Sequence, residues 1–330
     1  GKTVTAMMVS GLLRPEQADF RGRILLDGED LLHAGGQRIR AIQGKDICVV
    51  FQEPMSAMDP TMRIGKQVEE CLRVHTDLSA QERRQRALQA LRDVELPDPE
   101  GVYRKYPHEL SGGMLQRVMI AAAIVARPRL LLADEPTTAL DVTIQAQILA
   151  LLKRLNQEMG MSILFISHKL NEIMSVADRV TVLRKGKYIG TVNTKDTNKQ
   201  ELSNMMVGCP VQLQVNKDEA HPGDVVLSVK NFTVPSHLHK KDAVHNVSFD
   251  VRAGEIVCIA GIDGNGQTEF IHGLTGLDKS SGGSITVCGH DISHYSIHHR
   301  GEYISHIPED RHKHGLVLDF TLEQNLVLQR

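Results

Sequence analysis

The chain contains no tryptophan and few other aromatic residues, which make up 4% of its 330 residues. Any hydrophobic core must therefore be built from aliphatic side chains and methionine, and the apolar fraction of 41% allows one. The net charge of -2 gives no bulk electrostatic reason to expect a nucleic-acid partner. No apolar run reaches the roughly 18 residues of a membrane span, and no signal-peptide pattern is visible. If the protein serves a membrane, we expect it to do so from the cytoplasmic side and through partners.

Cysteine is scarce, and its spacing excludes common cysteine frameworks. The five cysteines are scattered, show no CxxC pair and are odd in number. This pattern favours reduced thiols in a cytosolic protein over a disulfide or metal framework. Three close histidine pairs have no carboxylate or cysteine partner at a recognisable ligand spacing, so we interpret them as solvated surface and not as a metal site: His237 and His239, His298 and His299, and His312 and His314.

Two short apolar runs predict buried parallel strands, at residues 129–133 and 162–166. A helical pattern over about residues 142–159 lies between them, so the three elements form a βαβ unit, which indicates an α/β fold. Charged and apolar residues alternate with helical period over residues 80–94, which predicts a surface helix.

A polar stretch rich in turn formers predicts a domain boundary. We expect a first domain over residues 1–208, a linker over 209–224 and a second domain over 225–330. The second domain opens with a strand at 225–229 and has a buried strand at 255–260 that ends in a glycine-rich turn. It therefore restarts an α/β pattern, which suggests an internal repeat. Both ends of the chain fall inside predicted elements, so we interpret the chain as a fragment.

The first three residues resemble the end of a phosphate-binding loop. Gly1, Lys2 and Thr3 precede an apolar helical stretch, as in a GxxxxGK[ST] loop cut at its second glycine. In such a loop, backbone N–H groups at a helix N-terminus bind phosphate oxygens. Lys2 would reach the β- and γ-phosphates, and Thr3 would offer a hydroxyl to Mg²⁺. A GKT tripeptide is also common by chance.

Polar residues follow both predicted strands. Asp134 and Glu135 come at the carboxyl end of the first strand, where ligands bind in parallel sheets. Asp134 is placed to hold Mg²⁺ through water, and Glu135 to orient or deprotonate an attacking water. His168 follows the next strand, so it can face the same site and contact the γ-phosphate or that water. Phosphoryl transfer needs a metal, a phosphate cradle and a positioned water, and little else.

Five short motifs follow one another along the chain, at residues 50–54 (VFQEP), 110–113 (LSGG), 130–135 (LLLADE), 139–141 (ALD) and His168. In kind and order they resemble the motifs of the ATP-binding cassette (ABC) ATPases. These resemble the Q-loop, signature, Walker B motif, D-loop and switch histidine. Five motifs in the family's order make a chance match implausible, although a serine and two glycines alone could be an ordinary helix N-cap.

The resemblance implies a P-loop NTPase fold with a helical segment inserted at about residues 59–127. It implies that Gln52 contacts Mg²⁺ and senses the membrane domains. Ser111, Gly112 and Gly113 would bind the γ-phosphate of ATP held by a second ABC domain, and Asp141 would also belong to the nucleotide site. Two such domains, in cis or in trans, would then close on two ATP molecules.

The two parts of the chain resemble different subgroups of the ABC importer ATPases. Residues 1–167 resemble the dipeptide, oligopeptide and nickel importer ATPases, through 51–65, 106–110 and 134–147. Residues 168–330 resemble the tandem-domain sugar and nucleoside importer ATPases, because the peptide group typically has an acid where Lys169 follows the histidine. One hypothesis is a chimera joined near His168, by recombination or by an error of sequence assembly.

The second domain contains a glycine-rich loop that resembles a degenerate phosphate loop. Its expected nucleotide-binding residues are Gly261, Gly264, Gly266, Gln267 and Thr268. Glutamine stands where lysine is expected, so the backbone donors survive but the cation does not. We expect weaker binding and poor hydrolysis here. A glycine-rich turn without a ligand is the alternative.

The resemblance implies an ATP-binding and hydrolysing subunit of an ABC importer that uses ATP and Mg²⁺ to drive uptake of a small solute. It implies permease transmembrane subunits as partners, a solute-binding protein indirectly, no nucleic acid, and a peripheral place on the cytoplasmic face of the inner membrane. A soluble ABC ATPase of translation or DNA repair is the alternative. Because most of the first phosphate loop is missing, we expect negligible ATP turnover from these 330 residues alone.

Overall fold

The computed structural model describes most of the chain. The described residues are 2–13, 17, 19, 21–138, 140–212, 219–236, 241–261 and 264–328, without the side chain of Arg311. Four parts of the expected features therefore lie outside them: Gly1, residue 139 of the expected D-loop, residues 213–218 of the expected linker and residues 262–263 of the second glycine-rich loop. The chain forms two compact units, Gly1–Gln214 and Val215–Arg330.

A three-stranded parallel sheet forms the centre of the first unit. It consists of β3 (Ile47–Val50), β4 (Leu130–Asp134) and β5 (Ser162–Ile166), in the order β3-β4-β5. The register pairs Ile47 with Leu130 and Asp134 with Ile166, so the carboxyl ends of β4 and β5 meet at one edge. The two predicted strands are therefore confirmed, and the helix α8 (Val142–Met159) connects them as expected.

Helices cover both faces of this sheet. Successive side chains of a strand point to opposite faces, so neighbouring residues pack against different helices. Leu131 packs into a cluster with α7 (Gly112–Ile124) and α8, whereas its neighbour Leu132 packs into a second cluster with Val9 at the end of α1 (Lys2–Val9). Both leucines are fully buried. The first helix ends earlier than the apolar run that follows Thr3, because Gly11 has a positive φ of 70°.

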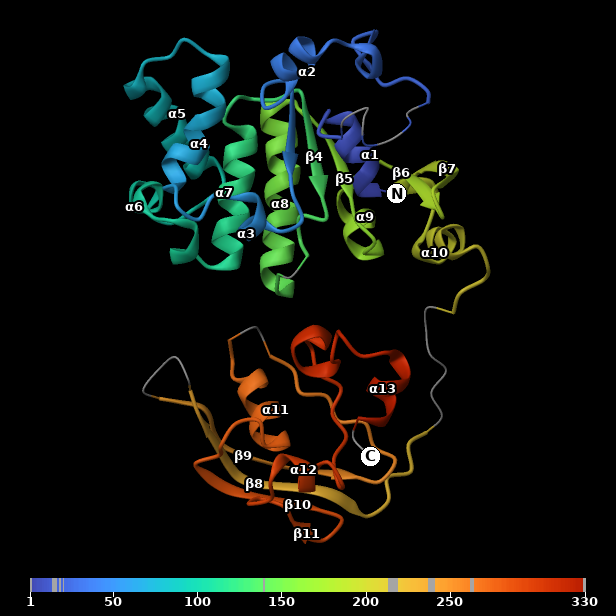
Figure 1. Cartoon of the computed structure of the whole chain (residues 1–330). Helices are drawn as coiled ribbons and strands as arrows, with labels where there is room; N and C mark the ends of the chain where they lie inside the picture. Colours follow the sequence, from blue (N-terminus) through green and yellow to red (C-terminus); the bar gives the residue numbers. More distant parts are fainter. Residues whose placement is uncertain are drawn as a thin grey trace. The chain divides into compact units, whose positions relative to one another are not determined.

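The helical segment lies to one side of the sheet, as Figure 1 shows. It consists of α3 (Pro54–Ala57), α4 (Ile64–His75), α5 (Ala80–Asp93), α6 (Pro99–Arg104), η3 (Pro107–Glu109) and α7. The predicted surface helix corresponds to α5, which Ser79 caps through a reciprocal capping box with Glu82. The α/β fold with an inserted helical segment is thus confirmed.

Smaller elements complete the first unit. They are β1 (Leu25–Leu26), β2 (Glu29–Asp30), η2 (Leu31–His33), α2 (Gly36–Ile42), α9 (Leu170–Val176), the hairpin of β6 (Arg179–Arg184) and β7 (Lys187–Asn193), η4 (Thr194–Asp196) and α10 (Lys199–Val207). Among the residues that the structure describes, no helix combines the length and apolar character needed to span a membrane.

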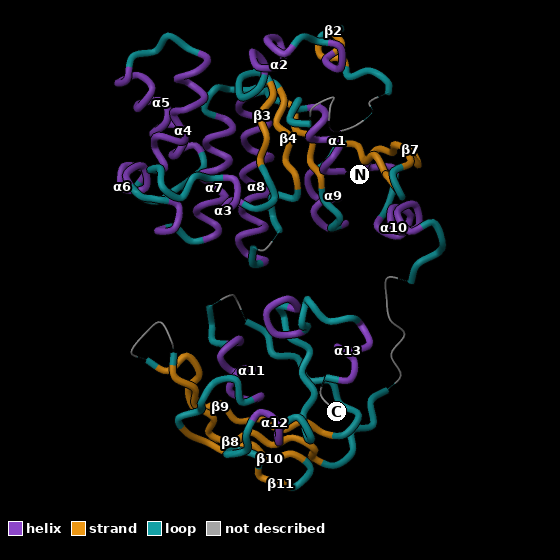
Figure 2. Tube along the Cα trace, viewed as in Figure 1, coloured by secondary structure: helices purple, strands orange, loops and turns teal. Residues whose placement is uncertain are grey.

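The second unit is built on an antiparallel sheet of order β11-β10-β8-β9, drawn in orange in Figure 2. The strands are β8 (Val225–Pro235), β9 (Asp242–Arg252), β10 (Gly282–Val287) and β11 (His290–Asp291). The helices are α11 (Gln267–Thr275), α12 (Ile297–Arg300), the π-helical turn η5 (Arg311–Gly315) and α13 (Leu322–Val327). Phe232 of β8 and Phe270 of α11 pack edge to face, with centroids 5.8 Å apart.

The prediction of a buried strand at residues 255–260 is wrong. This segment is irregular, and Ile256 is 86% exposed. A buried parallel strand needs strand partners and covering helices. The four described strands of this unit pair with one another, and none pairs with residues 255–260.

The buried thiols should be chemically inert. Burial, with a smaller effect of the neighbouring Cys71 thiol, raises the pKa of Cys48 to about 12, and burial raises the pKa of Cys71 to about 11. At pH 8 their thiolate fractions are about one in a thousand or less, and the thiolate is the reactive form. Iodoacetamide at pH 8 should therefore label the exposed Cys209, Cys258 and Cys288 but label Cys48 and Cys71 only in urea. Peptide mapping by mass spectrometry checks this, and equal labelling of all five would contradict it.

Candidate active site

Glu135 and His168 lie close together at the carboxyl ends of β4 and β5. The backbone N–H of Glu135 donates to the carbonyl of Ile166 at 2.9 Å, which extends the β4–β5 pairing by one residue. His168 Nδ1 then lies 3.0 Å from Glu135 Oε1. Glu135 has a positive φ of 46°, an uncommon conformation for a side-chain-bearing residue that clusters at functional sites.

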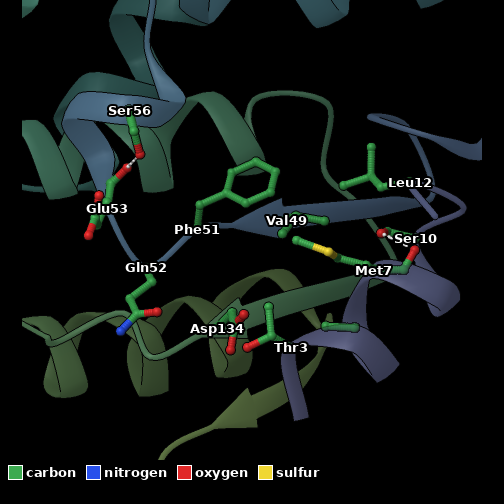
Figure 3. A pocket seen from close by; sticks show the side chains of 11 residues that line it. Thr3, Met7, Ser10, Leu12, Val49, Phe51, Gln52, Glu53, Ser56 and Asp134 are labelled. Atoms are coloured by element: carbon green, nitrogen blue, oxygen red, sulfur yellow. Dashed lines mark hydrogen bonds between the residues drawn. The ribbon is translucent and has the colours of Figure 1, made fainter. Parts of the chain in front are cut away.

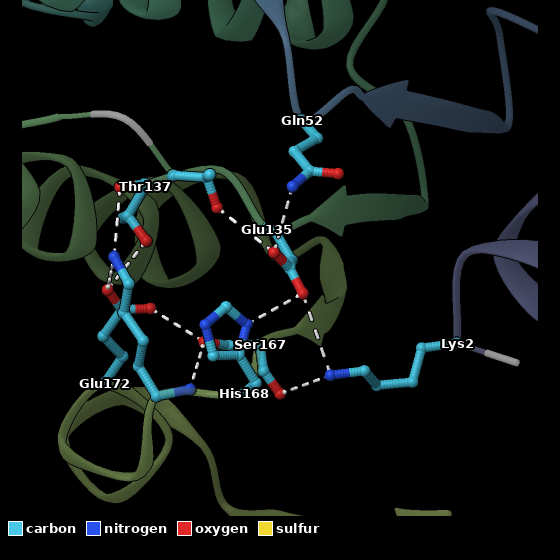
Figure 4. Close-up of polar contacts among 9 residues, drawn as sticks. Lys2, Gln52, Glu135, Thr137, Ser167, His168 and Glu172 are labelled. Carbon is cyan, nitrogen blue, oxygen red and sulfur yellow. Dashed lines mark hydrogen bonds and ion pairs between the residues drawn. The ribbon is translucent and has the colours of Figure 1, made fainter. Parts of the chain in front are cut away.

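Two further predicted residues reach Glu135, from α1 and from the end of β3 (Figure 4). Lys2 Nζ lies 3.8 Å from Glu135 Oε1 and donates to the carbonyl of Ser167 at 3.3 Å. Gln52 Nε2 donates to Glu135 Oε2 at 3.2 Å. Three residues from separate parts of the chain, Lys2, Gln52 and His168, thus converge on one carboxylate.

A pocket of about 230 Å³ lies beside these residues. Thr3, Gln52 and Asp134 line it, and Figure 3 shows the side chains of Thr3 and Asp134 pointing toward one another. Asp134 is 5% exposed, and its Oδ1 accepts no hydrogen bond from any described residue. A buried carboxylate oxygen without a donor suits a cation.

The donor set of this pocket therefore fits Mg²⁺. Carboxylate, hydroxyl and amide oxygens are the ligands that this hard cation prefers, and Asp134, Thr3 and Gln52 offer one of each. A lysine at the start of a helix beside them is suited to phosphate oxygens. These groups can support phosphoryl transfer to water, which depends on positioning and charge stabilisation.

Ser111, Gly112 and Gly113 lie away from this pocket, at the start of α7. Ser111 caps that helix, with its hydroxyl accepting from the N–H of Met114 at 3.4 Å. Gly113 packs closely against α8, because a Cβ there would lie 3.0 Å from Ile144 Cγ2. None of the three lines the pocket or bonds to Glu135 among the described contacts.

Asp141 has a structural contact. Its carboxylate accepts from the N–H of Ile144 at 2.9 Å and caps α8. A cap of this kind stabilises a helix by about 1 kcal/mol. The expected role of Asp141 in nucleotide binding stays a prediction.

The second glycine-rich loop leads into α11. Gly264 and Gly266 both have φ of 83°, and a Cβ at Gly266 would lie 2.3 Å from the carbonyl oxygen of Ala243, so only glycine fits. Gln267 begins the helix, and its amide lies against Gly261. The adjacent Thr268 follows within α11, and the loop's binding role stays a prediction.

Opposing effects set the pKa of Glu135. Burial is the largest single effect and raises it, but the hydrogen bond and charge of His168, the hydrogen bond from Thr138 and the charge of Lys2 together outweigh burial. The net result lowers the pKa of Glu135 below 4.5. The side chain is therefore ionised at neutral pH, as a base that accepts a proton from water must be.

The sequence interpretation missed the hydroxyl and carboxylate groups behind this site. Thr138 Oγ1 donates to Glu135 Oε2 at 3.2 Å. Thr137, Ser167 and Glu172 form a hydrogen-bonded group next to it. A single sequence carries no signal that Glu172 is buried, because one acid in a short helix is ordinarily solvated.

The chain belongs to the ABC transporter family, whose model matches residues 1–138 and 244–325. It is 41% identical over 308 residues to the peptidoglycan transport ATP-binding protein YejF of Agrobacterium fabrum, covering 90% of this chain and 56% of the relative. It is 34% identical over 339 residues to the glutathione import ATP-binding protein GsiA of Salmonella paratyphi A, covering 90% of this chain and 54% of the relative. The chain thus spans about half the length of these curated relatives.

Two further relatives bear on the resemblance. The oligopeptide transport ATP-binding protein OppD of Bacillus subtilis is 46% identical over 192 residues, covering 58% of this chain and 54% of the relative. The dimeric ATP-binding cassette MJ0796 bound to ADP and Pi superimposes with a TM-score of 0.53 at 30% identity, covering 59% of this chain and 81% of that chain. The peptide importer resemblance is confirmed. The sugar and nucleoside resemblance stays a prediction, as does the chimera, although the alignment to YejF extends across His168.

Removing His168 should raise the pKa of Glu135 toward its ordinary value, because His168 supplies the largest of the effects that lower it. A lowered folded-state pKa adds stability above the unfolded-state value, and this is lost as pH falls through the folded value. His168→Ala should therefore reduce the contribution of Glu135 ionisation to the free energy of unfolding at neutral pH. The ¹³C shift of the Glu135 carboxyl carbon over pH 2–7, assigned with Glu135→Gln, measures the pKa.

His33→Ala is the matched control, since it removes a histidine that pairs with Asp30 at 2.7 Å on the surface. It should leave the titration of Glu135 unchanged. An unchanged pKa of Glu135 in His168→Ala would show that the 3.0 Å contact does not govern its ionisation.

Proposed function

We propose that this chain is the ATP-binding and hydrolysing part of an ABC importer that couples ATP hydrolysis to uptake of a small peptide-like solute. The observation that carries the proposal is the convergence of Lys2, Gln52 and His168 on the ionised Glu135, beside a pocket with a donor-free Asp134 oxygen. The peptidoglycan, glutathione and oligopeptide names of the relatives support the solute class.

Each residue has a proposed role in hydrolysis. Asp134, Thr3 and Gln52 would hold Mg²⁺, which when bound neutralises charge on the phosphates. Lys2 would bind phosphate oxygens, with Gly1 contributing its backbone. Glu135 accepts a proton from the attacking water and orients it.

His168 has two proposed roles beside Glu135. Its ring contacts Glu135 at 3.0 Å, so it holds the carboxylate in position and offers its other nitrogen to the γ-phosphate or the attacking water. With Nδ1–H donating to that carboxylate, the other nitrogen of a neutral ring can accept from the attacking water, and it can donate to the γ-phosphate only in the doubly protonated ring.

A second ABC domain, in cis or in trans, is the proposed complement of this site. Ser111, Gly112 and Gly113 lie outside the pocket, which supports their action on ATP held elsewhere, and Asp141 would help to form the closed interface. The relative MJ0796 is dimeric with ADP and Pi bound. In the second unit, Gly261, Gly264, Gly266, Gln267 and Thr268 would bind ATP weakly, because Gln267 provides no cation.

The proposed partners are permease transmembrane subunits, with a solute-binding protein acting through them, and the proposed place is the cytoplasmic face of the cell membrane. A tagged protein expressed in its host should co-purify with membrane proteins in mild detergent. Co-purification with ribosomes instead would contradict the importer and favour the soluble translation ATPase.

Glu135→Gln should lower the ATP turnover of the assembled transporter by about 10²- to 10⁴-fold, because it removes the base without changing the size of the side chain. Binding of fluorescent trinitrophenyl-ATP should change little, since Lys2, Thr3 and Asp134 remain. Phosphate release and fluorescence titration measure the two effects.

Glu158→Gln on α8 is the matched control, because Glu158 is 56% exposed at its side chain and pairs only with Arg154 among the described contacts. It should keep full turnover. Undiminished turnover in Glu135→Gln would sink the proposed mechanism.

A further inference from the structure

Glu172, in the first turn of α9, is a buried carboxylate with three polar partners. It is 5% exposed. Thr137 Oγ1 donates to its Oε1 at 2.7 Å, Ser167 Oγ donates to its Oε2 at 2.9 Å, and Lys169 Nζ lies 3.1 Å from Oε1. A buried charge is stable only where such partners replace its water.

The two hydroxyl donors belong to the two loops that carry the reactive side chains. Thr137 comes two residues after Glu135, and Ser167 comes immediately before His168. Both are joined to the same carboxylate, as Figure 4 shows. The carboxylate therefore joins the two loops behind the 3.0 Å contact between His168 and Glu135.

Lys169 strengthens this connection with a charge. Its Nζ donates to the carbonyl of Thr137 at 3.2 Å, and its backbone N–H donates to Ser167 Oγ at 3.0 Å. The ammonium thus contacts the first loop and Glu172 together.

The helix does not need Glu172 for its apolar packing. Ile173, with Leu170 and Met174, packs into a separate cluster with β6, β7 and α10. Removing the carboxylate leaves that surface intact, so its effect should concentrate in the two loops.

We propose that Glu172, paired with Lys169, is a positioning residue that sets the geometry between Glu135 and His168. This inference rests on the proposed function, because the geometry serves the hydrolysis assigned to those two residues. Glu172 touches neither of them directly and acts through Thr137 and Ser167.

Hydrogen exchange of the 330-residue chain tests the connection without any nucleotide. Glu172→Ala should speed amide exchange by about tenfold in peptides that cover residues 134–142 and 165–169, because both loops lose their shared anchor. Exchange in β6 and β7 should stay unchanged. Asn171→Ala, at an exposed position of the same helix, is the matched control and should alter neither loop.

Kinetics of the assembled transporter test the consequence. Glu172→Ala should lower kcat by about 10- to 100-fold, since small misplacements of reacting groups cost this much. The KM for ATP should change less than about twofold, because the phosphate and Mg²⁺ residues are untouched. Asn171→Ala should keep both constants.

Two variants that change the charge of this pair distinguish a positioning role of Glu172 from a role in folding. Lys169→Met leaves a buried carboxylate without its cation and should lower kcat about tenfold. Adding Glu172→Gln should restore much of that loss, because a neutral amide can still bond to both hydroxyls. This pair of variants decides the matter if Glu172→Ala fails to fold.

Two results would overturn the inference. One is unchanged exchange in both loops of Glu172→Ala, and the other is a double variant no faster than Lys169→Met alone. Absence of ATP turnover in the unaltered transporter would instead contradict the proposed function, and the exchange measurement would still report on the loops.

Discussion

Parallel pairing of β4 with β5 holds the polar groups of the first unit within reach of one another. The register that sets Asp134 opposite Ile166 continues to the N–H of Glu135, so the chain turns at the same level in both strands. Glu135 and His168 meet because their strands end together. Lys2 and Gln52 reach the same carboxylate from α1 and β3, which pack on or pair with β4. A shift of one residue in this register would separate the whole group.

The sequence contained enough information for the strands and for the residues that follow them. The predicted strands at residues 129–133 and 162–166 are apolar runs of strand length with turn signals around them, and Asp141 caps α8. Residues 255–260 show the same apolar pattern, yet they form no strand. Periodicity reports that side chains are apolar, whereas strand formation also depends on which neighbours are available to pair.

The supporting contacts could not be predicted in this way. Thr137, Ser167 and Glu172 are common residue types, and their grouping depends on the relative placement of two loops and a short helix. Likewise, the positive φ of Glu135 and the donor-free oxygen of Asp134 are properties of the folded backbone. Motifs identify which residues can perform chemistry, and the fold determines how firmly each is held.

The irregular segment 255–260 has a consequence for handling the protein. It contains exposed Ile256, Val257 and Ile259, has no proline and carries one charge. A short apolar segment with unpaired backbone groups is a template for strand exchange between copies. The exposed thiol of Cys258 sits within it, so copies that associate there bring two oxidisable sulfurs together. We therefore expect self-association of the purified chain to increase with protein concentration and in the absence of a reducing agent.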